Sequence, residues 1–244
     1  MIQYVIAGLV LGGIYAIASA GIVVTYRAAG ILNFGFGALA YFISRFYYFL
    51  HTQHGWAIAP AALVSVVLAG PALGVVLYFG LFRLLRLAAP LVQVMVTLGV
   101  SVCLPTIAAL VFGNVPIVKA PGLAPEPVRV FRIVGVPVTM DQLIVYVSVV
   151  VVLVVGALVL RCTDVGLRVR AMVDSPAMTA LSGTNPKLVS VGVWAMSVFL
   201  AGLAGVLSAP IIGLAPADHT RGVPRSARFR RRGRRARGGS TEPA

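Results

Sequence analysis

The sequence predicts an all-α integral membrane protein, a polytopic helical bundle of about six transmembrane segments. Of its 244 residues, 59% are hydrophobic and only 11% are charged, and the mean hydropathy is +0.99. Soluble domains are about half apolar and about a quarter charged, so this balance is typical of a membrane protein. A bilayer core about 30 Å thick needs roughly 20 apolar residues of helix. Six stretches reach or approach that length, at residues 2–26, 34–50, 56–82, 88–112, 143–160 and 189–214.

The first predicted span contains no charged residue, and it opens without the basic segment and cleavage site of a secretory signal. We therefore expect it to be retained in the membrane. Small side chains are abundant in the first and last spans, which predicts close packing between helices. They are Gly8, Gly12, Gly13, Ala16, Ala18 and Ala20 in one, and Ala201, Gly202, Ala204 and Gly205 in the other.

The second predicted span is shorter than the others and is interrupted by Arg45. An ionisable residue inside a membrane span is a functional candidate by default. The simpler interpretation is a side chain that extends to the membrane surface, or a misplaced span boundary.

Two polar segments separate the later spans. Residues 114–142 are rich in proline and contain a Val/Ile-rich patch that predicts a small hairpin outside the bilayer. Residues 161–188 form the second segment. With the N-terminus outside, the inner loops hold seven Lys and Arg and the outer loops three, which favours an extracytoplasmic N-terminus and a cytoplasmic 161–188 loop. The inner set is Arg27, Arg83, Arg86, Arg161, Arg168, Arg170 and Lys187, and the outer set is Lys119, Arg129 and Arg132.

The C-terminal tail does not fit this topology, because a sixth span entered from inside would place nine arginines of segment 221–237 outside. Three explanations stay open: a re-entrant last span, the opposite orientation, or a tail that is not original membrane-protein sequence. The abrupt change to Arg, Gly, Pro, Ser and Ala resembles an out-of-frame reading of a GC-rich gene. We expect residues 1–217 to form the transmembrane domain, and residues 218–244 to be a disordered or frameshift-derived tail that gives little support for nucleic-acid binding.

The cytoplasmic loop contains a short helix with both ends marked. Ser175 suits the N-cap, Pro176 the first helical position and Gly183 the residue after the end. Met178 and Leu181 lie three apart on one side, and basic residues flank the segment. Two interpretations stay open: a helix that lies on the lipid headgroups, or an apolar knob that docks onto a cytoplasmic partner.

The stretch "GLRVRAMVDSPAMTALSGTNP" resembles the cytoplasmic coupling loop of the branched-chain amino acid permeases of ABC importers. The resemblance implies that residues 174–183 insert into a cleft of an ATPase subunit and transmit ATP-driven motion to the spans. Two other stretches resemble the same family: "GLVLGGIYAIASAGIVVTYRAAGILNFGFGALA" near the start of the chain, and the last span, "FLAGLAGVLSAPIIGLAP". Members of the family normally continue with further spans after Pro216. The positions that match the family's loop are Gly166, Arg170, Ala171, Ala177, Ala180, Gly183 and Asn185.

The junction between the first two spans, "RAAGILNFGFGALAYF", matches the family's Gly-x-x-Asn-Phe-x-x-Gly pattern. Discontinuous helices near the midplane can expose backbone groups to a polar substrate, so this junction is a candidate for the substrate path. The alternative is that Asn33 only caps a helix. Phe36 stands where many family members carry His or Gln. The candidate residues are Gly30, Asn33, Phe34, Gly35 and Gly37.

The chemistry of the chain indicates a transport subunit rather than an enzyme. Neither of its two lysines follows a glycine, so a nucleotide-binding loop ending in Gly-Lys-Ser/Thr is impossible and ATP must be used by another subunit. The acids and histidines lie outside the apolar runs, which disfavours both proton-driven carriage and general acid–base catalysis. Cys103 and Cys162 indicate neither a disulfide framework nor a metal site. We expect no catalytic residue, metal or bound cofactor.

The resemblance implies a multi-pass permease subunit of the inner (plasma) membrane that imports branched-chain or related amino acids delivered by a binding protein. Its partners would be two ATPase subunits, a second permease subunit, an extracytoplasmic substrate-binding protein and membrane lipid, with no nucleic acid. The alternatives are an ATP-independent carrier or channel for a small solute, and a non-transporting membrane scaffold.

Overall fold

The structure, a computed structural model, describes residues 2–30, 32–85, 88–113, 120–124, 130–133, 136–174 and 185–212. All of them belong to one compact unit, Met1–Leu214. The predicted tail at 218–244, and the segment 175–184 that carries most of the predicted docking helix, lie outside the described residues.

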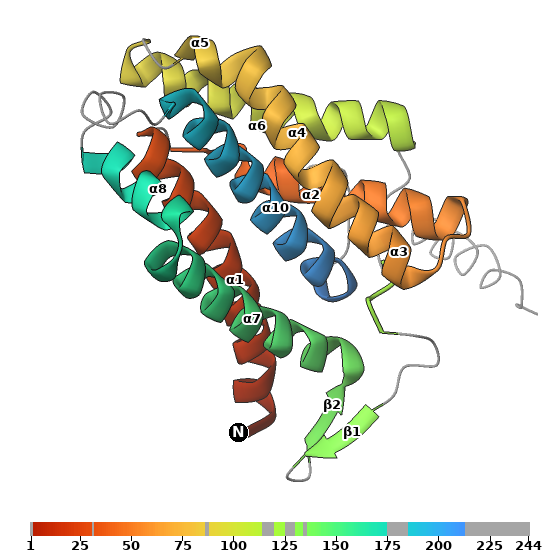
Figure 1. The fold of residues 1–244 in the computed structure, drawn as a ribbon. Helices are drawn as coiled ribbons and strands as arrows, with labels where there is room; N and C mark the ends of the chain where they lie inside the picture. Colours follow the sequence, from red (N-terminus) through yellow and green to blue (C-terminus); the bar gives the residue numbers. More distant parts are fainter. Residues whose placement is uncertain are drawn as a thin grey trace, which may run out of the picture. The chain divides into compact units, whose positions relative to one another are not determined.

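Helices make up nearly all of the described chain, as Figure 1 shows. The N-terminal half contains α1 (Ile2–Ala29), α2 (Phe36–Tyr48), η1 (Phe49–Gln53), α3 (Ile58–Leu63), η2 (Val64–Ala69), α4 (Gly70–Leu77), η3 (Tyr78–Phe82) and α5 (Arg83–Leu85). The second half contains α6 (Pro90–Phe112), β1 (Val130–Ile133), β2 (Val136–Thr139), α7 (Met140–Cys162), α8 (Asp164–Asp174) and α10 (Pro186–Ile212). Elements α3 to α5 follow one another without a break, so they form one long helix with two π-helical sections.

Five helices of the described chain are long and apolar enough to cross a membrane, which confirms the all-α polytopic fold. They are Gly8–Arg27, Ile58–Leu85, Pro90–Phe112, Met140–Cys162 and Lys187–Ile211. The predicted span at 34–50 differs from these: its α-helix, α2, has 13 residues. Leu39, Ile43 and Tyr47 of α2 are completely buried. This segment is lined by protein rather than by lipid, which is why it tolerates tyrosines and an arginine.

The predicted hairpin between α6 and α7 is also present. Strands β1 and β2 pair antiparallel, with Val130 opposite Thr139 and Ile133 opposite Val136. Thr139 then begins α7 with a capping box: its Oγ1 accepts from the Gln142 amide at 3.4 Å, and its own amide donates to Gln142 Oε1 at 3.1 Å. The box satisfies two amides that would otherwise lack partners at the helix start.

Helix α10 lies at the centre of the described bundle, where it contacts α1, α2 and α4 (Figure 1). Glycines make these approaches close. A Cβ on Gly74 of α4 would lie 2.7 Å from the Trp194 carbonyl oxygen, and one on Gly202 of α10 would lie 2.8 Å from Ile43. A Cβ on Gly205 would meet the Ala40 carbonyl of α2. The predicted close packing therefore holds for the last span.

The small residues of the first span contribute less than those of α10. The structure leaves open space beside Gly8 and Gly12, whereas Gly13 faces Val149 of α7. Gly21, which the sequence did not single out, accommodates the ring of Phe36 and lies next to Leu200 of α10. The crossing of α1, α2 and α10 therefore depends on Gly21.

Stacked rings hold the end of the α3–α5 helix against the start of α10. Phe82 and Trp194 stack with centroids 3.6 Å apart and ring planes 15° apart. Tyr78 and Leu85 complete this buried cluster. Such an aromatic pair contributes about 0.5–1.5 kcal/mol beyond the area it buries.

Replacing Gly74 by Val should destabilise the protein, because the new Cβ would meet the Trp194 carbonyl, a backbone atom that cannot rotate away. We expect a loss of about 1–3 kcal/mol, the usual cost of overpacking. The measurement is the thermal unfolding midpoint of the purified chain in detergent.

The matched control is Gly99→Val on α6, since no heavy atom lies within 4 Å of a Cβ built at Gly99. Gly99→Val should unfold within a few degrees of wild type. Equal midpoints for the two variants would contradict the close α4–α10 approach.

Candidate functional site

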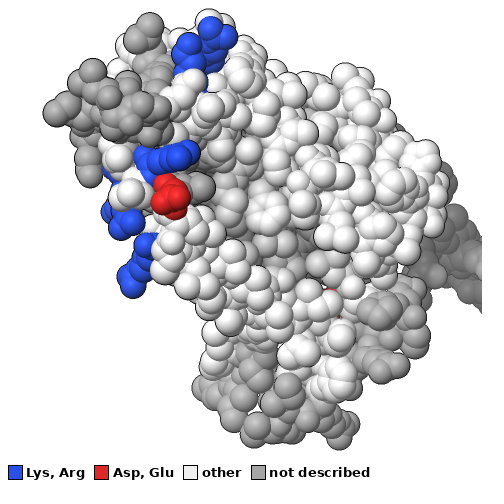
Figure 2. All heavy atoms as spheres, viewed as in Figure 1, with Lys and Arg blue, Asp and Glu red and all other residues white. Residues whose placement is uncertain are grey.

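The exposed basic side chains of the described chain lie at one end of the bundle, called the basic end below. On the face drawn in Figure 2, the visible Lys and Arg side chains gather on one side, and the rest of the described residues on that face are almost free of charge. Contacts show that these helix ends meet: Arg168, Val24 and Leu188 line one cavity, and Phe82 stacks on Trp194 near the start of α10. The residues are Arg27, Arg83, Arg161, Arg168, Arg170 and Lys187. Arg132 lies in the β1–β2 hairpin, after the opposite end of α6.

Helix α8 brings three of the predicted loop residues together: Gly166, Arg170 and Ala171. The amide of Gly166 donates to Thr163 Oγ1 at 3.3 Å, which starts the helix. Gly166 is buried, and a Cβ there would collide with the backbone of Leu160. The glycine therefore permits the sharp turn from α7 into α8. Arg170 Nε donates to the Gly166 carbonyl at 3.4 Å, so two matched positions of the family pattern contact each other.

Asn185, at the other end of the loop, begins α10. Its Oδ1 accepts from the Lys187 amide at 3.0 Å, and its carbonyl accepts from the Leu188 amide at 3.2 Å. These bonds satisfy amides of the first helical turn. The remaining docking candidates, Ser175, Pro176, Ala177, Met178, Ala180, Leu181 and Gly183, lie outside the described residues.

The junction between α1 and α2 is a turn closed by Asn33. Gly30 ends α1 with a positive φ of 70°, and its amide donates to the Tyr26 carbonyl at 2.9 Å. The side-chain Oδ1 of Asn33 then accepts from the Gly35 amide at 3.0 Å, while its carbonyl accepts from Phe36 at 3.4 Å. Asn33 thus closes the turn that precedes α2, whose N-cap is Gly35 without a side-chain cap hydrogen bond. The two alternatives for Asn33, a helix cap and a place in the substrate path, stay predictions.

The side-chain amide nitrogen of Asn33, Nδ2, takes no part in the hydrogen bonds of this turn. Asn33 is 2% exposed, and its Nδ2 has no hydrogen-bond partner among the described residues. Thr97 of α6 lies beside the turn, with its carbonyl 3.3 Å from a Cβ built at Gly35 and its hydroxyl 3.5 Å from the Leu32 carbonyl. Asn33 and Thr97 therefore form a buried polar pair at this turn. The sequence did not indicate Thr97 as a candidate.

The other residues of the predicted junction do not join this polar group. Phe34 is 47% exposed, whereas Phe36 is 5% exposed. Phe36 packs with Leu39, Val100 and Val198. Gly37 is exposed, with no heavy atom within 4 Å of a built Cβ. The structure brings together Asn33 and Gly35 but places Phe34 and Gly37 on the surface of the described chain.

Arg45 lies in the protein interior beside the end of the α6 span, Pro90–Phe112, and the interpretation as a residue near a span boundary stays a prediction. It is 1% exposed. Its guanidinium donates to the Gly113 carbonyl at 2.5 Å and lies 5.9 Å from the ring centroid of Tyr48. Gly113 follows the last turn of α6, where carbonyl groups lack partners and the helix dipole is negative. Arg45 therefore fixes α2 to the end of α6.

A second polar contact that the sequence did not reveal joins α1 to α10. The Gly21 carbonyl accepts from Ser197 Oγ at 3.2 Å and from Thr25 Oγ1 at 2.9 Å. Thr25 and Ser197 are completely buried. Their only signal in the sequence is a hydroxyl within an apolar span, which does not identify the partner.

Comparison with known protein families identifies the chain. The family model described as the permease component of branched-chain amino acid transport systems matches residues 4–224. The chain belongs to this family. It is a permease component of the membrane, a transport subunit rather than a catalytic enzyme, as the sequence predicted. Searches of curated proteins and of solved structures give no significant match.

Replacing Arg45 by Met should destabilise the permease, because methionine fills much of the same space but cannot donate to Gly113. A hydrogen bond from a charged group contributes about 1.5–3 kcal/mol, so we expect a loss of that order in the thermal unfolding measurement. Arg83→Met, an exposed arginine at the basic end, is the control and should leave the midpoint unchanged. Equal unfolding midpoints for Arg45→Met and Arg83→Met would show that the Arg45–Gly113 hydrogen bond does not stabilise the protein.

Proposed function

We propose that this chain is the membrane-spanning subunit of an ATP-driven importer of branched-chain or related amino acids in the inner (plasma) membrane. An extracytoplasmic binding protein delivers the substrate, and two ATPase subunits and a second permease subunit complete the assembly. The family match supports the substrate class. The absence of a Gly-Lys pair from the whole sequence supports ATP hydrolysis in a separate subunit.

The observation that carries this proposal is the basic end, from which α8 and α10 both start. Cytoplasmic loops of membrane proteins are enriched in Lys and Arg. The described exposed basic side chains lie at this end, so it faces the cytoplasm and the N-terminus of α1 is extracytoplasmic. The loop 161–188 then projects toward the ATPase, and residues 174–183 dock into it.

The packing of the bundle suggests how ATP-driven movement reaches the substrate path. The loop ends at Asn185, which caps the first turn of α10. Displacement of the loop therefore acts directly on α10. Helix α10 is close-packed against α2 and α4 through Gly205, Gly202 and Gly74. We therefore propose that these helices move as one body, while α7, which has few contacts with α10 along its length, changes its position relative to them.

The buried pair Asn33 and Thr97 is the best candidate for a polar contact with the substrate. It lies on α6 and on the turn that precedes α2, toward the basic end. Nδ2 of Asn33 is a hydrogen-bond donor, and the carboxylate of an amino acid substrate is a suitable acceptor. The hydrogen bond that Oδ1 accepts from the Gly35 amide holds the Asn33 side chain in a fixed orientation.

Two substitutions test the docking of residues 174–183. Ala180→Asp places a charge in the middle of the proposed helix, and Gly183→Pro removes the residue suited to its end. We expect either change to weaken ATPase binding by roughly tenfold or more, the effect of losing a central interface contact. Co-purification of the co-expressed ATPase with the membrane-inserted permease measures it.

Ala89→Asp is the matched control, because Ala89 is exposed at the basic end outside the loop and an aspartate suits its position before Pro90 of α6. It should retain the ATPase. Unchanged co-purification with both loop variants would remove the docking assignment, and uptake that persists after deletion of the ATPase would favour an ATP-independent carrier.

A further inference from the structure

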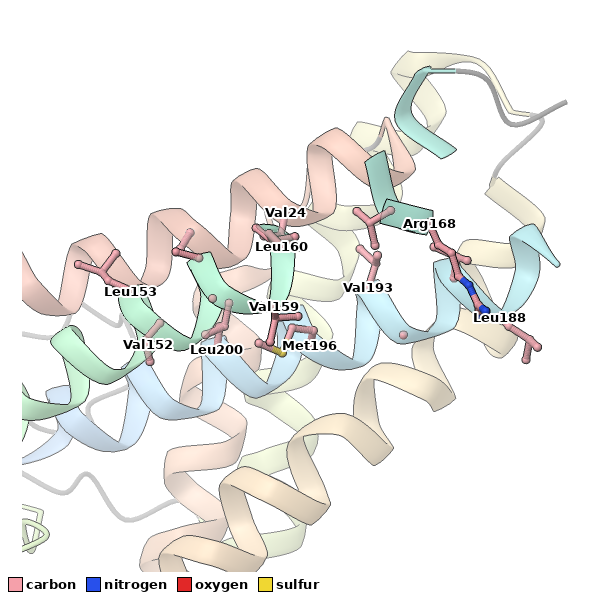
Figure 3. A pocket seen from close by; sticks show the side chains of 16 residues that line it. Val24, Val152, Leu153, Val159, Leu160, Arg168, Leu188, Val193, Met196 and Leu200 are labelled. Carbon is pink, nitrogen blue, oxygen red and sulfur yellow. The ribbon is translucent and has the colours of Figure 1, made fainter. Parts of the chain in front are cut away.

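An apolar cavity of about 530 Å³ lies between α1, α7, α8 and α10. Figure 3 shows Val24 of α1, Val159 and Leu160 of α7 and Met196 of α10 facing it. Among the described residues that line the cavity, Arg168 of α8 is the one that carries a charge. Sites that hold a single small molecule usually measure about 300–1,000 Å³, so the cavity is large enough for one ligand of mainly apolar character.

The cavity is a groove. It is closed at the end away from the basic end, and it is open toward the basic end and along one side. At the closed end, Val152 and Leu200 belong to the buried cluster that joins α1, α7 and α10. Toward the basic end, Leu160 of α7 and Leu188 of α10 line the cavity and are 38% and 70% exposed. Leu153, which also lines the cavity, is 54% exposed and lies near the middle of the candidate span Met140–Cys162, so the open side of the groove faces the acyl chains of the bilayer.

Two glycines widen the groove. Gly156 of α7 and Gly192 of α10 line it, and a Cβ built on either has no heavy atom within 4 Å. Neither glycine is needed for helix–helix contact within the described chain, in contrast to Gly202 and Gly205.

The open end of the groove carries positive charge. The Arg168 side chain extends toward Leu188 at this end (Figure 3). Arg161, Arg170 and Lys187 are exposed nearby in the chain, and Asp164 is the one acidic residue between 161 and 170. An apolar groove that ends at an arginine matches an amphiphile with a hydrocarbon chain and an anionic head.

We propose that the groove binds one anionic phospholipid of the surrounding leaflet, with an acyl chain between α7 and α10 and its phosphate on Arg168. Basic pockets between transmembrane helices on the cytoplasmic side bind acidic lipid headgroups in this way. The site requires only that the chain is in the membrane, and not that it is part of an ATP-driven importer. Only the assignment to the cytoplasmic leaflet rests on the proposed function, through its orientation.

The bound lipid would occupy the space that opens between the two helices flanking the coupling loop. Because α7 and α10 are joined by this loop, lipid in the groove sets the distance between them. The site is therefore suited to make the permease sensitive to the anionic lipid content of the membrane.

Native mass spectrometry of the full-length chain in mild detergent tests the site. The protein is supplied with phosphatidylglycerol and phosphatidylcholine of matched acyl chains, which differ in mass and in headgroup charge. We expect one retained lipid, with phosphatidylglycerol favoured by about fivefold, the contribution of one arginine near an anionic headgroup. Arg168→Gln should remove the headgroup preference, while Arg83→Gln, at the basic end but outside the groove, should keep it.

Filling the groove tests the acyl-chain part separately. Gly156→Leu and Gly192→Leu should reduce retention of both lipids, whereas Gly80→Leu, an equally open glycine outside the groove, should not. Equal retention of the two lipids by wild type, or a preference that survives Arg168→Gln, would overturn the proposal. So would masses of protein dimers in place of lipid adducts, because another copy would then cover the groove. None of these outcomes depends on ATPase binding, which is measured separately.

Discussion

The close approach of α10 to its neighbours is the constraint on which the rest of the structure depends. Lipid is as apolar as leucine, so the hydrophobic effect does not hold membrane helices together, and contact between backbones must replace it. Gly205 and Gly202 bring α10 against α2, and Gly74 brings α4 against α10. Hydrogen bonds then fix the arrangement, since the buried hydroxyl of Ser197 binds the Gly21 carbonyl of α1. Each of these contacts places a backbone group or a small side chain where a larger residue would clash.

This packing divides the bundle into a firm part and a more adaptable part. Helices α2, α4 and α10 meet at backbone distance, and Arg45 ties α2 to the end of α6. Helix α7 packs against α1 and α10 through side chains such as Val149 and Val152 in its middle, and its C-terminal half borders the groove. The loop that is proposed to contact the ATPase connects α7 with α10, so a movement of the loop acts on the boundary between the firm part and the adaptable part. The groove lies along the same boundary.

Length and hydropathy predicted most of the fold, because a membrane span must be long and apolar whatever its neighbours are. Those same properties cannot show which face of a span is buried. The sequence therefore predicted close packing for Gly8 and Gly12, beside which the structure leaves open space, and overlooked Gly21. It also could not reveal the partner of Arg45, because Gly113 is 68 residues away. The turn at Asn33 and the cap at Asn185 are local interactions, so a short stretch of sequence contains both partners of each bond. Thr97 could not be recognised from sequence, because only the fold brings it beside Asn33.

The most direct test of the division into two parts is a pair of distance measurements between spin labels, with and without ATP on the assembled transporter. The exposed Cys103 and Cys162 are replaced first. Labels at Leu188 and Leu84, which are 70% and 75% exposed, report within the close-packed part, and labels at Leu188 and Leu160 report across the groove. The Leu188–Leu84 distance should stay constant when ATP binds, while the Leu188–Leu160 distance changes. A Leu188–Leu84 distance that changes as much as the Leu188–Leu160 distance would contradict the movement of α10 as one body with α4, whose helix continues without a break to Leu84.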